Sequence, residues 1–133
     1  MSYSAFILLP VHQEVSLEQI EQLLRTFFEQ SDNPENQKAR IIRNNTTIQY
    51  KRNNWNAYIA PVNNVNVSTE NPEIAQQIQQ KRPNTTNNTV YIAKLEITTS
   101  KDRTMDYFND YVLILERLEQ IPHALLYDGC IPL

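Results

Sequence analysis

Residues 43–60, RNNTTIQYKRNNWNAYIA, decide the fold because they contain two Asn-Asn pairs, one at 44–45 and one at 53–54. Asn adopts a positive φ more readily than any residue except Gly, so each pair is predicted to form a two-residue hairpin turn. The three antiparallel strands joined by these turns are expected near residues 38–43, 46–52 and 55–62. We call this predicted unit, residues 38–62, the meander.

The two turns determine which side chains share a face of the meander. One face is apolar, with the rows Ile41, Ile48, Ile59 and Ala39, Tyr50, Ala57, and with Trp55 beside Arg52. The other face is mostly polar, with the rows Arg40, Gln49, Tyr58, then Lys38, Lys51, Asn56, then Ile42, Thr47, Ala60. A slip of one residue in either turn would mix apolar and polar side chains on both faces, so the two turn predictions support each other.

Helices and further strands are predicted on both sides of the meander. Ser16 begins a helix with Gln19 as its capping-box partner, and the helix ends before Pro34. A short helix is expected to begin after Asn71, and a longer one to span about 104–120. Further strands are expected at 3–9, 62–67, 89–97 and 124–127, the second of them on an edge of the sheet.

These elements predict an α+β fold. The chain of 133 residues is expected to form one two-layer domain, residues 1–133. Its mixed or antiparallel sheet contains the three-stranded meander and packs against two long helices and one short helix. The strand at 3–9 is apolar at both parities, which is typical of an interior strand.

Composition argues against several classes of function. Gly129 is the single glycine, so neither glycine-rich nucleotide-binding motif can be present. No pattern of Cys and His suggests a zinc site, and the single Cys130 has no neighbouring base that would activate it. No cofactor or metal is therefore expected. Residues 1–10 lack a basic segment and no apolar run could cross a bilayer, so a cytoplasmic protein without membrane contact is expected.

Charge is unevenly distributed along the chain. Residues 36–95 contain eight basic and two acidic side chains, whereas the whole chain has a net charge of −3 and an isoelectric point near 5.3. The candidate binding residues lie on the polar face of the meander, where cations beside an aromatic ring suit an anionic partner. They are Lys38, Arg40, Lys51 and Tyr58.

Two further groups of polar residues give weaker signals. Asp102, Asp106 and Asp110 recur every four residues, which suits a divalent cation or acid–base chemistry. In the simpler interpretation, Asp102 and Asp106 lie near a helix N-terminus, where negative charge is favourable. Asp110 then faces solvent, opposite a core-facing stripe that contains Met105, Phe108 and Leu115. His12 and His123 each lie just after a proline and would meet in a pocket if their strands were neighbours. No Ser or Cys nucleophile has partners at a defined spacing, so no catalytic residue is assigned.

The favoured interpretation is a non-enzymatic protein-interaction domain that recognises its partner by charge complementarity. Small bacterial adaptor and immunity proteins have this general architecture, which is an analogy of fold alone. The first alternative is single-stranded nucleic-acid binding by the basic sheet face, against which the acidic isoelectric point and the single exposed aromatic weigh. The second is a small-ligand binder or enzyme with a pocket near His12 and His123. A monomer or a homodimer is expected, the latter through the edge strand at 62–67.

Overall fold

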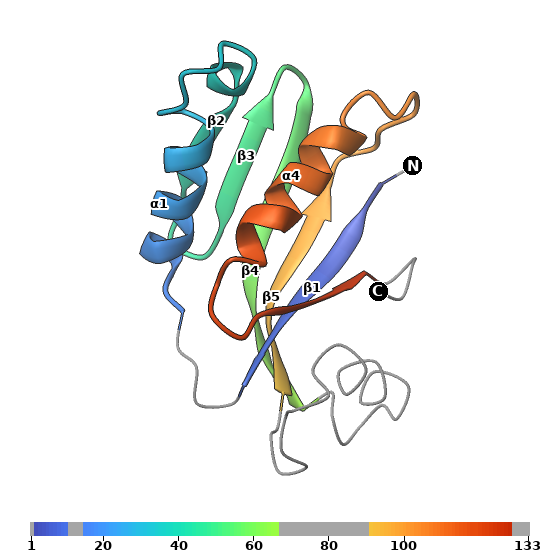
Figure 1. Cartoon of the computed structure of the whole chain (residues 1–133). Coiled ribbons are helices and arrows are strands. Elements are labelled where there is room, and N and C mark those ends of the chain that lie inside the picture. Colours follow the sequence, from blue (N-terminus) through green and yellow to red (C-terminus); the bar gives the residue numbers. More distant parts are fainter. Residues whose placement is uncertain (1, 11–14, 67–90, 129–133) are drawn as a thin grey trace.

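A six-stranded antiparallel sheet and two α-helices are formed by residues 2–10, 15–66 and 91–128, the parts of the chain that this computed structural model describes (Figure 1). The strands lie in the order β2-β3-β4-β5-β1-β6, and each neighbouring pair is antiparallel. Their bounds are β1 (Ser4–Pro10), β2 (Arg40–Arg43), β3 (Ile48–Arg52), β4 (Trp55–Asn66), β5 (Tyr91–Thr99) and β6 (Leu125–Asp128). The α+β class predicted from the sequence is confirmed.

The two helices, α1 (Leu17–Phe27) and α4 (Phe108–Leu118), lie on the same face of the sheet (Figure 1). The predicted capping box begins α1: the Ser16 hydroxyl accepts from the Gln19 N–H at 3.2 Å, and the Gln19 side chain accepts from the Ser16 N–H at 2.9 Å. A short 3₁₀ helix, η1 (Asn36–Lys38), precedes β2. No helix in the described ranges has the length and apolar content needed to cross a bilayer.

The main hydrophobic core fills the space between the sheet and the helices. Tyr50 lies at its centre, in edge-on contact with Phe28 at 4.9 Å and with Trp55 at 5.8 Å between ring centroids. A smaller cluster on the opposite face of the sheet contains Leu8, Tyr91, Ala93 and Leu125. Because successive strand residues point to opposite faces, β1 is buried on both sides, as expected for an interior strand.

The second Asn pair forms the predicted turn. Arg52 pairs with Trp55 and Ile48 pairs with Ile59, which leaves Asn53 and Asn54 as a two-residue turn between β3 and β4. Asn53 adopts the left-handed conformation, with φ 54°. The predicted register between these two strands is therefore confirmed.

The first Asn pair does not form the predicted two-residue turn. Arg43 pairs with Ile48 instead of residue 46, and the four-residue loop 44–47 is closed by a hydrogen bond from the Asn44 N–H to the Thr47 carbonyl at 2.9 Å. The register between β2 and β3 thus differs from the prediction by two residues. Because the side-chain repeat in a strand is also two, the shift leaves the apolar and polar faces unchanged.

The three remaining predicted elements have different outcomes. The segment at 62–67 extends the meander as the continuation of β4, which runs through Asn66 and pairs there with β5, while its pairing with β3 ends at Ile59. Residue 67 lies outside the described residues. The helix predicted from about 104 begins at Phe108, and Met105 and Phe108, expected in the core, are 51% and 40% exposed. The short helix predicted after Asn71 lies outside the described residues.

Candidate interaction surface

The polar side of β2, β3 and β4, which faces away from the helices, carries three of the four predicted binding residues. Arg40 lies directly opposite Lys51, and in the next row Ile42 lies opposite Gln49, which lies opposite Tyr58. Arg40 and Lys51 are exposed, and Ile42 and Tyr58 are exposed by 39% and 37%. We call this surface the open face and define it by Arg40, Ile42, Gln49, Lys51, Asn56 and Tyr58.

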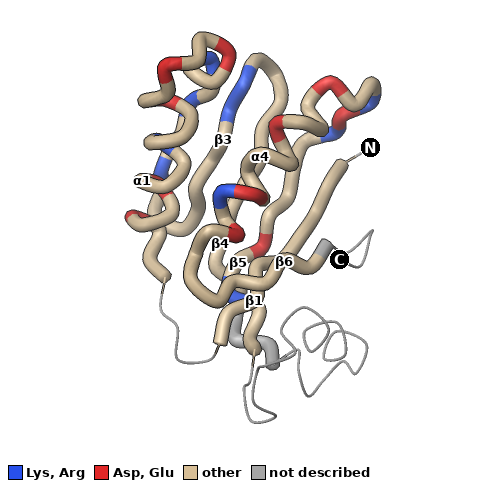
Figure 2. Tube along the Cα trace, in the orientation of Figure 1, with Lys and Arg blue, Asp and Glu red and all other residues tan. Residues whose placement is uncertain are grey.

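The open face is positively charged. Arg40 and Lys51 form no ion pair with any residue that the structure describes. The guanidinium group of Arg40 donates a hydrogen bond to the Gln37 carbonyl at 3.3 Å. Within the described ranges, the nearest acidic residue on the same face of the sheet is Glu96 of β5, opposite Ala60. Figure 2 shows the cationic positions along β3 and the acidic positions on α1 and the loop that follows it.

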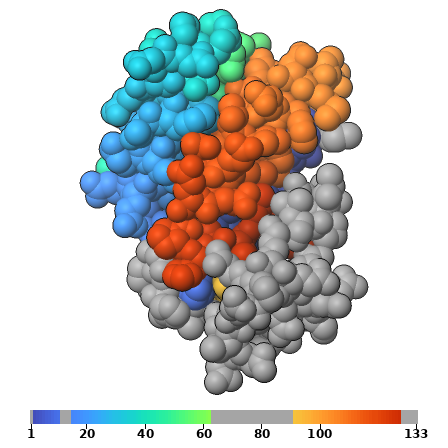
Figure 3. Space-filling model, in the orientation of Figure 1, coloured from blue at the N-terminus to red at the C-terminus, as the bar shows by residue number. Residues whose placement is uncertain are grey.

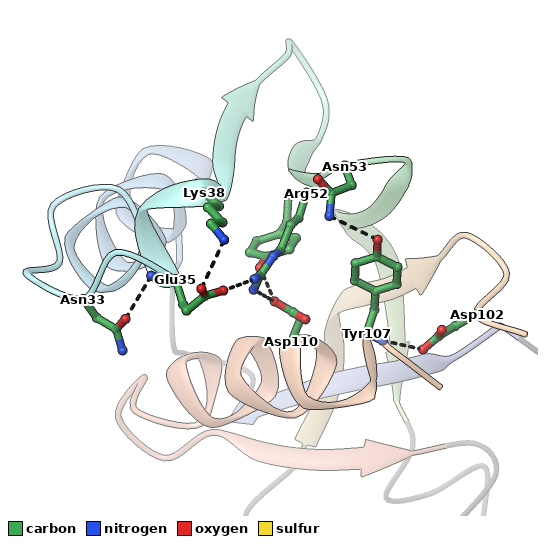
Figure 4. Close-up of polar contacts among 9 residues, drawn as sticks. Asn33, Glu35, Lys38, Arg52, Asn53, Asp102, Tyr107 and Asp110 are labelled. Carbon is green, nitrogen blue, oxygen red and sulfur yellow. Dashed lines mark hydrogen bonds and ion pairs between the residues drawn. The ribbon is translucent and has the colours of Figure 1, made fainter. Parts of the chain in front are cut away.

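Lys38 does not belong to this surface. The sequence placed it in a strand beside Lys51, but β2 begins at Arg40 and Lys38 ends η1. Its ammonium group lies 3.1 Å from a carboxylate oxygen of Glu35 (Figure 4). This contact, together with that of Arg52, lowers the pKa of the Glu35 carboxyl group. Lys38 is therefore already partnered within the chain.

A second polar cluster lies between the sheet and α4 and was not predicted. Asp110 is buried, although the sequence placed it on the solvent side of the helix. Its carboxylate accepts from the Tyr50 hydroxyl at 2.7 Å and from Arg52 at 2.9 Å, and Arg52 also reaches Glu35 at 2.7 Å (Figure 4). Burial raises the pKa of Tyr50, and the hydrogen bond to Asp110 raises it further.

The three regularly spaced aspartates do not meet. The buried Asp102 accepts from the Tyr3 hydroxyl at 2.8 Å and from the Tyr107 N–H at 3.0 Å, whereas Asp106 is exposed and accepts from Thr104. Burial and the contact with Asp102 raise the pKa of Tyr3 to about 12. No group of three His, Cys, Asp or Glu side chains that could hold a metal ion occurs in the described part of the chain.

The predicted pocket near His12 and His123 cannot be compared with the structure, because His12 is not among the described residues. His123 is exposed and has a positive φ of 65°, while His12 and Cys130 lie outside the described residues. A hollow of about 220 Å³ lies close by in the chain and is lined by Ile121 and Pro122, but its described lining includes no histidine or carboxylate. That lining offers no acid–base group for catalysis.

Known protein families, curated proteins and solved structures include none that matches this chain. Its function is therefore inferred from its own residues. The sequence pattern found Arg40, Lys51 and Tyr58, and it also placed Ile42 on the polar face without recognising it as part of a binding surface. Ile42 lies two residues after Arg40 in the same strand, so both side chains point to the same face. This spacing alone indicates that the large apolar side chain of Ile42 is exposed to solvent.

Proposed function

We propose that residues 1–133 form a single two-layer α+β domain that acts as a non-enzymatic interaction module and binds an acidic protein across the open face. The observation that carries this proposal is the direct opposition of Arg40 and Lys51 beside the exposed Ile42 and Tyr58. Tyr and Arg are enriched in the energetic centres of protein interfaces, where they combine a large contact area with hydrogen bonding.

The opposed cations also give a physical reason for an acidic partner. Like charges directly opposite each other on neighbouring strands destabilise a sheet. Neither Arg40 nor Lys51 is neutralised by a carboxylate among the described residues. A partner that places a carboxylate between them removes this repulsion and adds charge-assisted hydrogen bonds. Relief of the repulsion between Arg40 and Lys51 would thus contribute to the free energy of binding.

Single-stranded nucleic acid is the alternative partner, because phosphates would also neutralise Arg40 and Lys51. Sheet-based nucleic-acid binders combine several exposed aromatic rings with a strongly basic surface. The open face has one exposed aromatic ring, Tyr58, and the isoelectric point of the chain is near 5.3. These two observations favour a protein partner.

Site-specific photo-crosslinking in an extract of the source organism tests the proposal. A photoreactive amino acid at position 58 is expected to capture a protein, and Lys51→Glu is expected to abolish the adduct because it reverses the charge beside the probe. The same reactive group at Glu18, an exposed position on α1, serves as the control for non-specific capture. Adducts that contain nucleic acid, equal adducts at both positions, or no adduct at position 58 would refute the proposal.

A further inference from the structure

A groove runs between α1 and the C-terminal end of α4, on the face of the molecule opposite the open face. Figure 3 shows the two helices side by side on this surface. The groove consists of two adjoining hollows, of about 220 and 540 Å³, which share Gln19, Leu23 and Gln120. Its apolar wall is formed by Val15, Leu23, Phe27 and Ile121, all of which are only partly buried.

Among the described residues that line this groove, Arg117 is the one cation, and it lies at one end. The guanidinium group of Arg117 sits 4.2 Å above the ring of Phe27, and its Nε atom is buried without a hydrogen-bond partner. The carboxylate that pairs with it among the described residues is that of the adjacent Glu116, at the long distance of 3.9 Å. No acidic side chain is among the described residues that line either hollow, so the charge of Arg117 is only weakly neutralised.

We infer that this groove binds a small amphipathic carboxylate, with its hydrocarbon part along Leu23 and Ile121 and its carboxylate against Arg117. Ligand sites are typically apolar pockets with a few polar groups that orient the ligand, and arginine suits planar, two-pronged contact with a carboxylate. An apolar cavity of about 150 Å³ holds benzene, so the hollow of about 220 Å³ beside Ile121 suits a chain of about six to eight carbons. The amide groups of Gln22 and Gln120 border the groove, and that of Gln22 donates to the Thr26 hydroxyl at 3.2 Å.

This site is separate from the open face, so its test does not depend on the proposed function. Titration of the ¹⁵N-labelled protein with octanoate, and in parallel with the uncharged 1-octanol, tests it by NMR. Saturable shifts are expected at the amides of Leu23, Phe27 and Ile121, with octanoate binding at least about tenfold more tightly because only the carboxylate can pair with Arg117. Equal affinities, shifts outside the groove, or no saturable shifts would overturn the inference. This comparison uses the wild-type protein and does not depend on the folding of any variant.

A pair of matched variants identifies the cation. Arg117→Gln is expected to reduce the affinity for octanoate at least about tenfold and to leave that for 1-octanol within about twofold. Arg103→Gln removes an equal charge from an exposed position in the loop before α4 and is expected to change neither affinity. Loss of octanoate binding in both variants, or in neither, would contradict the role of Arg117.

Discussion

Arg52 joins three elements through two carboxylates. Arg52 pairs with Trp55, so its side chain points to the face of the sheet that the helices cover. A charged group that is partly buried there requires an oppositely charged partner. The guanidinium reaches Glu35 in the loop after α1 and Asp110 in α4. Burial by itself would lower the pKa of Arg52, but the hydrogen bond and charge of Asp110 outweigh burial and raise it. Asp110 thus stabilises the charged form of Arg52.

Replacement of Asp110 tests the energy of this cluster. Asp110→Ala leaves the Tyr50 hydroxyl and one side of Arg52 without an acceptor, so we expect the free energy of unfolding to fall by about 2–4 kcal/mol. Urea denaturation measures this change. Asp106→Ala is the control, because Asp106 is exposed and its loss is expected to cost about 0.5 kcal/mol or less. Similar losses in both variants would show that the buried contacts of Asp110 contribute nothing.

Tyr3 links stability to alkaline pH. Its pKa rises from 10.0 to about 12 in the folded protein because of burial and the contact with Asp102. A group whose pKa is raised by folding stabilises the protein below the unfolded pKa and loses this contribution as the pH passes through the folded pKa. The free energy of unfolding is therefore expected to fall between pH 10 and 12. In the Tyr3→Phe variant it is expected to fall less steeply with pH over the same range. An unchanged slope in denaturation experiments across this range would contradict the account.

At the scale of the elements, the two Asn pairs show what local sequence could and could not predict. The apolar and polar parities of the strands were predictable, because burial of Ile48, Tyr50 and Ile59 requires that alternation. The turn type was predictable only where positive φ is used, at Asn53. The 44–47 loop is instead closed by a hydrogen bond from the Asn44 N–H to the Thr47 carbonyl. The Asn-Asn pair itself does not determine whether the loop has two or four residues.

Substitution at the two Asn pairs tests this difference. Asn53→Ala is expected to lower the free energy of unfolding by about 1 kcal/mol, because alanine tolerates the left-handed conformation poorly, whereas Asn53→Gly retains it. Asn45→Ala is the matched control, since Asn45 has no positive φ and its replacement is expected to stay within about 0.5 kcal/mol. Thermal unfolding of the three variants supplies the comparison, and equal losses at positions 45 and 53 would contradict it.

The beginning of α4 depends on a contact that the sequence conceals. Asp102 is held by Tyr3, which is 99 residues away in the chain, and by the N–H of Tyr107. These bonds, together with a φ of 60° at Met105, keep residues 102–107 in a turn and delay the helix to Phe108. Helical spacing alone therefore predicted both an early start for this helix and an exposed Asp110. Only the tertiary contacts determine the actual geometry.

At the scale of the whole molecule, the sheet separates two surfaces with different chemistry. The helical face carries the acidic positions of α1 (Figure 2). It also carries the apolar groove with Arg117, whereas the open face carries Arg40 and Lys51 without described carboxylate partners. Both helices cover one face of the sheet, and on the other face the polar side chains of β2, β3 and β4 are at least partly exposed, whereas Leu8, Tyr91, Ala93 and Leu125 are buried there. Binding of an acidic protein to the open face is the central claim that this arrangement supports.

The dissociation constant of the partner captured at position 58 tests that claim most directly, measured for the wild type, Lys51→Glu and Arg103→Glu at two salt concentrations. Lys51→Glu is expected to weaken binding at least about tenfold, and the wild-type affinity to fall as salt screens the charges. Arg103→Glu makes the same reversal outside the open face and is expected to leave the affinity within about twofold. Equal affinities for all three proteins, independent of salt, would contradict the account.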